Sequence, residues 1–193
     1  KGGWGSARLL EYNINWQNSW MMGFSDTCSL LLSKYEQGFL GSIHGPMIST
    51  LADEPDWSTN RLKNLLFDGK LGDIIGTPLK KGLAKGEIIV SNLSIFCSLI
   101  GTRFSPDISG KIVIFEDVNE DLYKIDRMLT QFRMTEKIDH LAGIGFGNFF
   151  VSSNNLSEQT LLKELILERF YKFNIPIVCD LPIGHIKGNA CVP

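Results

Sequence analysis

The chain has 193 residues, of which 44% are hydrophobic and 21% charged, and its formal net charge is −2. These are ordinary values for a globular fold and exclude a largely disordered chain. No run of Lys or Arg offers the basic face that nucleic-acid binding needs. The longest apolar run, residues 88–100, is interrupted by Ser91, Asn92 and Ser94, and is too short to span a membrane. We therefore expect neither a nucleic-acid nor a membrane partner.

The four cysteines are predicted to be buried, reduced thiols, because none of them forms a C-x-x-C pair. No Cys and His residues cluster at the spacing of zinc ligands, so we expect no metal site. This usage favours a reducing compartment. The cysteines are Cys28, Cys97, Cys179 and Cys191.

In the first half of the chain, short apolar runs alternate with helical patterns. The apolar residues 20–24 predict a strand buried on both faces, which ends at Ser25-Asp26. A helix is expected after it, to end near Gly38. The other predicted elements are a helix over 7–12, a strand over 39–43, and a helix over 61–67 with Ser58 or Thr59 as its N-cap.

Residues 70–85 are rich in glycine, proline and lysine, which indicates a boundary. We expect residues 1–70 to form the first part of the chain, 71–85 a linker, and 86–193 a second domain.

The second half also mixes strands with helices, so an α/β fold is predicted. Its clearest helices show apolar residues at helical spacing, over 122–132 and from 154–157 onward. The predicted strands are 87–90, 111–115, 141–146 and 175–179.

Gly23-Phe24-Ser25-Asp26 places a serine between a buried strand and a helix. A serine on such a sharp turn projects its hydroxyl at the sheet edge, beside the free N–H groups of a helix start. Thr27 stands where the G-x-S-x-G elbow has its second glycine. A plain helix N-cap is the alternative interpretation of this pattern.

His185 follows a buried strand in a loop held by Pro182 and Gly184, which suits a general base at the same sheet edge. Glu116 follows the apolar strand 111–115 and could hold the imidazole. Glu120 is a close competitor, and Asp117 points to the opposite side if the strand persists. Each residue alone also fits a surface loop or an acidic turn. Together, in the order Ser, acid, His, they favour a serine hydrolase.

At this point the chain resembles the LD-carboxypeptidases, which are muramoyltetrapeptide carboxypeptidases and serine peptidases of the S66 type. The resemblance covers nearly the whole chain in matching order. The family usually has G-G-N-L where this chain has Val90-Ser91-Asn92-Leu93. The matching segments are Lys1-Gly2-Gly3-Trp4-Gly5-Ser6, Gly23-Phe24-Ser25-Asp26, His44-Gly45-Pro46, Phe115-Glu116-Asp117 and Leu181-Pro182-Ile183-Gly184-His185.

The resemblance implies a triad of Ser25, Glu116 and His185. It implies an oxyanion hole made by the backbone N–H of Asp26 and that of Gly3 or Gly2. It further implies a flavodoxin-like N-terminal part, incomplete here, and a smaller α/β C-terminal domain with the site between them. No metal or other cofactor is implied.

The implied substrate is a murein tetrapeptide that loses its terminal D-Ala during peptidoglycan recycling in the cytoplasm, and the implied assembly is a homodimer. A cation should hold the substrate carboxylate, and the candidates are Lys1, Arg8, Arg103 and Arg127. The microcin-immunity branch, which cleaves peptidyl or aminoacyl nucleotides, is one alternative, with Trp57 as its stacking residue. A binding relic without turnover is another.

Residues 1–60 offer few partners for the predicted strand over 20–24. Two strands do not make a stable parallel sheet. We therefore expect an unpaired edge or an exposed apolar face beside this strand. The family resemblance further implies a preceding half domain and a short tail outside these 193 residues.

Overall fold

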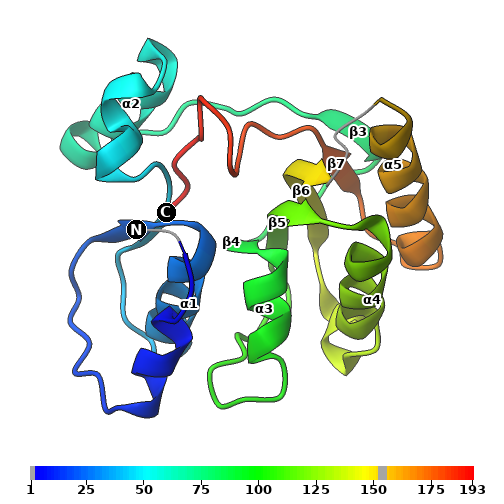
Figure 1. The fold of residues 1–193 in the computed structure, drawn as a ribbon, viewed down its shortest axis with the longest axis horizontal. Helices are drawn as coiled ribbons and strands as arrows, with labels where there is room; N and C mark the ends of the chain where they lie inside the picture. Colours follow the sequence, from blue (N-terminus) through cyan, green and yellow to red (C-terminus); the bar gives the residue numbers. More distant parts are fainter. Residues whose placement is uncertain (1–2, 152–155) are drawn as a thin grey trace.

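The computed structural model describes residues 3–151 and 156–193. Helices and strands are mixed along the chain, which confirms the α/β class. Figure 1 shows the N-terminal elements on one side and a larger sheet with its helices on the other. The elements are η1 (Ser6–Glu11), β1 (Met21–Gly23), η2 (Ser25–Thr27), α1 (Cys28–Glu36), β2 (Ser42–His44), η3 (Ile48–Asp53), α2 (Asp56–Lys63), η4 (Asn64–Asp68), β3 (Thr77–Lys80), β4 (Ile88–Asn92), α3 (Leu93–Leu99), β5 (Ile112–Glu120), α4 (Leu122–Arg133), η5 (Glu136–His140), β6 (Gly143–Val151), α5 (Leu156–Phe170) and β7 (Ile177–Cys179).

The strands form two sheets. β1 and β2 pair in parallel, and the larger sheet has the order β3-β7-β6-β5-β4. Its strands β4 to β7 are parallel, and β3 is antiparallel to β7. The carboxyl ends of parallel strands share one edge of a sheet, where open α/β folds place their ligands.

Side chains of β5 alternate between two cores. Val113 and Phe115 belong to the main core, where the Phe115 ring lies 5.1 Å from those of Phe96 and Phe132 in edge-to-face contacts. Ile114 belongs to a smaller core formed with residues 181–192. Because strand side chains alternate, Glu116 shares the face of Ile114 and lies under that C-terminal segment.

The C-terminal segment links the two parts of the molecule. After β7 it runs back past α2 to the N-terminal elements (Figure 1). There His44 and Val192 exchange both backbone hydrogen bonds, each at 2.8 Å. This return brings residues 184–192 from the end of the chain to the carboxyl end of β1.

A buried lysine holds the segments that lead into β1 and β2, the two strands of the small sheet. Lys34 of α1 is 1% exposed, and its Nζ donates to the backbone oxygens of Ser19, at 2.6 Å, and of Leu40. These carbonyls precede β1 and β2, so a single ammonium ties both strands to α1. Burial lowers the pKa of Lys34.

Several predicted elements differ from the structure. The strand expected over 20–24 is shortened to β1, and Trp20 is 59% exposed. The prediction that this strand is buried on both faces is therefore wrong. Among the described residues, β1 has β2 as its one strand neighbour, and the expected unpaired edge is present. The strand expected over 39–43 begins only at Ser42.

The helix expected over 61–67 begins earlier, at Asp56. Pro55 occupies the N-cap in place of Ser58 or Thr59, because a fixed φ near −65° suits a helix start. Helix α3 follows directly on β4, where only a strand was predicted.

The segment expected as a linker, 71–85, contains β3, which joins the larger sheet through β7. The division of the chain into residues 1–70 and 86–193 stays a prediction.

Candidate active site

Ser25 is the first residue of η2 and lies on a strained turn that follows β1. Its φ of 61° is in the left-handed region, which is uncommon for residues other than glycine. Such strain persists only where the surroundings impose it, and it clusters at functional sites. Gly23 permits the tight approach, since a Cβ there would lie 2.9 Å from Cγ2 of Thr27. The turn therefore has the geometry of an elbow without the second glycine of the motif.

The glycine-rich opening is tied to this elbow. Ser6 donates its backbone N–H to Oδ2 of Asp26 at 2.9 Å and its hydroxyl to the Asp26 carbonyl at 2.5 Å. Ser29 donates its hydroxyl to the same carbonyl at 3.0 Å. Gly3, three residues before Ser6, is exposed and has a φ of 123°. Gly2 lies outside the described residues.

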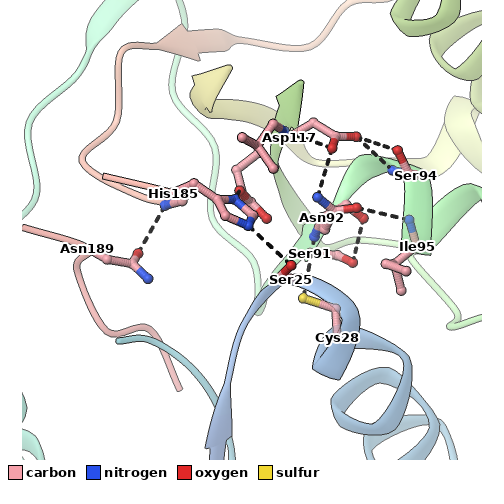
Figure 2. A network of polar contacts seen from close by, with 12 residues as sticks. Ser25, Cys28, Ser91, Asn92, Ser94, Ile95, Asp117, His185 and Asn189 are labelled. Carbon is pink, nitrogen blue, oxygen red and sulfur yellow. Dashed lines mark hydrogen bonds and ion pairs between the residues drawn. The ribbon is translucent and has the colours of Figure 1, made fainter. Parts of the chain in front are cut away.

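His185 connects the serine to a carboxylate. Its Nε2 lies 3.1 Å from Oγ of Ser25, and its Nδ1 lies 2.7 Å from Oε2 of Glu116. The ring of Phe24 packs edge-on against the imidazole at 4.8 Å. The structure thus brings Ser25, Glu116 and His185 together in one chain of contacts. Figure 2 shows the contact between His185 and Ser25.

Glu116 is fully buried. Burial raises the pKa of its carboxyl, and the hydrogen bond to His185 opposes that rise. Gly184 packs directly on it, since a Cβ at Gly184 would lie 2.8 Å from Oε2. Its other oxygen, Oε1, has no hydrogen-bond partner among the described residues. The Oε2 atom of the carboxylate therefore bonds to His185.

The neighbouring acids have other partners. Asp117 points to the opposite face of β5, as the strand alternation predicts, and accepts from Nδ2 of Asn92 at 2.9 Å and from Oγ of Ser94 at 2.7 Å (Figure 2). Glu120 lies 3.6 Å from Lys124. Of the three candidate acids, Glu116 is the one that contacts His185.

Asn92 ties the elbow helix to the larger sheet. Its side chain caps α3 by accepting from Ile95 N at 3.1 Å, and its backbone N–H donates to Sγ of Cys28 at 3.4 Å. Ser91, fully buried beside it, donates to the Asn92 carbonyl at 2.9 Å. Residues 90–93 differ from the G-G-N-L of the family, but Asn92 still forms a helix cap there (Figure 2).

His44 is a buried neutral imidazole near the site. It is 3% exposed, and neither of its ring nitrogens has a hydrogen-bond partner among the described residues. Burial, with a smaller effect of His185, lowers the pKa of His44 to about 3. Its ring packs edge-on to Phe24 at 6.0 Å.

The candidate cations make contacts elsewhere. Arg8 lies over the ring of Trp4, and Arg127 lies over Tyr123. Arg103 donates to the carbonyl of Leu10 at 3.5 Å. Lys1 lies outside the described residues.

The four cysteines are free and buried, as predicted. Within residues 3–151 and 156–193, no three His, Cys, Asp or Glu side chains are grouped to hold a metal ion. None of the helices described in these ranges is long and apolar enough to cross a membrane.

The residues that sequence reasoning missed lie in the loop around His185 and against it. Asn189 is 2% exposed and accepts from the backbone N–H of Gly184 at 3.0 Å. Glu54 accepts from the backbone of the same loop. No local pattern signals these contacts, because Glu54 and Asn189 are 135 positions apart in the chain.

Comparison with known families identifies relatives of this chain. The sequence model of the LD-carboxypeptidase C-terminal domain matches residues 85–193. The whole chain matches a Synechocystis sp. protein that carries the name of a carboxypeptidase, with 38% identity over 198 residues that are 65% of that protein. It also matches a Bacillus subtilis protein named as a probable murein peptide carboxypeptidase, with 31% identity and 64% of that protein covered. The chain thus spans about 65% of the length of these relatives.

Solved structures show the same fold. The muramoyltetrapeptide carboxypeptidase of Oxalobacter formigenes superposes with a TM-score of 0.78 at 23% identity, and the match covers 100% of this chain and 70% of that one. The microcin C7 self-immunity protein in complex with aspartyl sulfamoyl adenosine superposes with a TM-score of 0.77 at 18% identity, over 100% of this chain and 68% of that one. At these identities the likeness establishes the fold alone.

Proposed function

Because the chain belongs to the LD-carboxypeptidase family, we propose that it is part of a serine carboxypeptidase that removes the terminal D-Ala from murein tetrapeptides. The observation that carries this proposal is the chain of contacts from Ser25 through His185 to Glu116. A hydroxyl, an imidazole and a buried carboxylate in this order are the parts of a nucleophilic triad.

Ser25 is the nucleophile in this proposal. Its Oγ attacks the carbonyl carbon before the C-terminal D-amino acid, while Nε2 of His185, 3.1 Å away, takes the hydroxyl proton. Glu116 accepts the Nδ1–H of His185 at 2.7 Å. That bond fixes the tautomer that leaves Nε2 free to accept, and it stabilises the imidazolium once the proton has moved.

The negative charge that develops on the substrate oxygen needs donors. The backbone N–H of Asp26, at the start of η2, and that of Gly3 are the proposed pair. The two hydrogen bonds from Ser6 to Asp26 support this pair, because they hold the glycine-rich turn against the elbow. Gly3 suits the role because its φ of 123° is one that other residues rarely adopt.

His185 then returns the proton to the leaving amine, and D-Ala departs from an acyl-enzyme on Ser25. Water, deprotonated by the same imidazole, hydrolyses the ester and restores the serine. Each step is proton transfer and acyl transfer between Ser25, His185, the substrate and water, so the proposed sequence uses no metal and no cofactor.

The finer features follow from the family and complete the proposal. They are a flavodoxin-like first part, a smaller C-terminal domain and a site between them. A homodimer, and peptidoglycan recycling in the cytoplasm, belong to the same proposal. The return of residues 184–192 to the N-terminal elements supports a site built from both parts.

The second candidate is the cleavage of peptidyl or aminoacyl nucleotides. Trp57 favours it, because this ring is 46% exposed and lies against the His185 loop, where a Cβ at Gly188 would be 2.6 Å from Cζ2. An exposed aromatic face beside the loop that carries His185 could stack on a base. The fold match to the microcin self-immunity protein is consistent with this candidate.

The test is to incubate the purified protein with a murein tetrapeptide and with an aminoacyl sulfamoyl adenosine, and to weigh the products. The proposal predicts a tripeptide and free D-Ala from the first compound. Turnover of the nucleotide with an untouched tetrapeptide would instead support the second candidate. If neither compound is cleaved, the binding relic becomes the better account.

A further inference from the structure

One face of α2, together with Glu54 two positions before the helix, holds the loop that carries His185. Oε2 of Glu54 accepts from the backbone N–H of Gly188 at 2.8 Å and from that of Asn189 at 3.1 Å. Two consecutive N–H groups on one carboxylate oxygen form a charge-assisted pair, and such bonds are stronger than neutral ones. Figure 1 shows the C-terminal segment passing beside α2.

Residues on α2 add three contacts along the same loop. The buried hydroxyl of Ser58 donates to the Asn189 carbonyl at 3.0 Å, and Nε of Arg61 donates to the Cys191 carbonyl at 3.0 Å. The ring of Trp57 covers Gly188. Trp57, Ser58 and Arg61 recur at helical spacing on α2, so one face of the helix makes these three contacts, and Glu54 adds its own from the segment just before the helix.

The hydrogen bonds continue inward to the triad. Oδ1 of Asn189, itself 2% exposed, accepts from the backbone N–H of Gly184 at 3.0 Å (Figure 2). Gly184 packs on the Glu116 carboxylate and precedes His185. A path of direct contacts therefore runs from Glu54 through Asn189 and Gly184 to the imidazole.

We propose that Glu54 and Asn189 are positioning residues, which hold the His185 loop so that Nε2 faces the hydroxyl of Ser25. This inference rests on the proposed function and adds two residues to it. The path joins two distant parts of the chain, because Glu54 follows the elbow by about 30 residues and His185 lies near the C-terminus.

The effect acts on the rate of the chemical step. The loop contributes the base to a 3.1 Å contact with Ser25, and a shift of about 1 Å in such a geometry can lower the rate about 100-fold. Glu54 and Asn189 bond to backbone groups of the loop, so their loss should change kcat while KM stays nearly constant.

The test compares Glu54→Ala and Asn189→Ala with the wild-type protein by D-Ala release from a murein tetrapeptide. Glu54→Gln is the conservative variant, since its amide oxygen still accepts both N–H groups. Asp53→Ala is the matched control, because Asp53 is an exposed carboxylate one position earlier. Thermal unfolding selects the variants that are folded, and two independent alanine variants keep the test open if one of them fails to fold.

We expect each alanine variant to lower kcat by about 10- to 100-fold with KM within about twofold of wild type. Glu54→Gln should recover at least about fivefold of that loss, and Asp53→Ala should match wild type. Folded alanine variants with a kcat within twofold of an active wild type would overturn the inference. A loss of the same size in Asp53→Ala would also overturn it.

A second readout separates this inference from the proposed function. If the wild-type protein releases no D-Ala, the proposed function fails, and the Cε1–Hε1 NMR signal of His185 still reports on the positioning. The alanine variants should shift that signal. A signal identical to wild type in both alanine variants would overturn the positioning role.

Discussion

Gly184→Ala is the change most directly aimed at the contact between Glu116 and His185. Gly184 has a φ of 121°, a conformation that a residue with a Cβ rarely adopts. The added Cβ would lie 2.8 Å from Oε2 and 2.9 Å from Cβ of Glu116. Ordinary contact begins near 3.4 Å, so the carboxylate or the loop must move by roughly half an ångström or more.

The magnitude follows from these two effects. A strained backbone conformation costs of order 1–3 kcal/mol. Overpacking against a fully buried group adds typically 1–3 kcal/mol. We therefore expect a loss of about 2–6 kcal/mol in the free energy of unfolding. The displaced imidazole should lower kcat for D-Ala release by about 100-fold.

Gly38→Ala is the matched control, because Gly38 has a φ of 81° and a Cβ there would meet nothing within 4 Å. Urea unfolding and the rate of D-Ala release are measured for both variants. The control should lose stability through backbone strain alone and keep its rate. Equal rate losses in the two variants, or a Gly184→Ala variant with the wild-type rate, would refute the reasoning about this contact.

Three further predictions concern buried ionisable groups. Because burial lowers the pKa of His44 to about 3, its contribution to stability is complete above the unfolded pKa of about 6.5 and is lost as pH falls toward 3, by up to about 1.4 kcal/mol per pH unit. His44→Gln should flatten this slope in urea unfolding, and an unchanged slope would contradict the burial of a neutral ring. Since burial raises the pKa of Glu116, its contribution to stability is present below about 4.5 and is lost as pH rises from there toward the folded pKa, so the stability of Glu116→Gln relative to wild type should increase as pH rises above about 4.5. A stability of Glu116→Gln that falls relative to wild type as pH rises would contradict this prediction. Lys34→Met removes the charged donor shared by the backbone carbonyls of Ser19 and Leu40 and should lower the unfolding free energy by about 1–3 kcal/mol, which a variant as stable as wild type would disprove.

Strand alternation allowed the acid to be anticipated from the sequence. The apolar run before Glu116 identifies a buried strand, and a period of two separates Glu116 from Asp117. The structure follows this rule, because β5 continues through Glu120 and places Asp117 on the α3 side. The local pattern separated Glu116 from Asp117, whereas the choice of Glu116 over Glu120 came from the family resemblance.

The start of α2 and the presence of α3 were harder to anticipate. Pro55 is the N-cap of α2, and the first turn of this helix is polar, so no apolar spacing indicates where the helix begins. Asn92 ends β4 and caps α3, and no loop separates the two elements. The strand and the helix therefore lie within one apolar run of the sequence. In both places, tertiary packing decides between patterns that the sequence leaves open.

The contacts of Glu54 and Asn189 could not be anticipated at all. They depend on the return of the C-terminal segment across the molecule, and no local motif encodes that path. The sequence thus identifies the residues that carry the chemistry, whereas the residues that position them are identified only from the fold.

The central claim is that Ser25 is a nucleophile activated by His185. The most direct measurement is labelling of the purified protein with a fluorophosphonate, followed by digestion and mass spectrometry to locate the adduct. The account predicts one adduct, on Ser25, that forms at least about 100-fold more slowly in His185→Gln because triad members act as a unit. An adduct on another residue, or labelling of Ser25 at the same rate without His185, would contradict it.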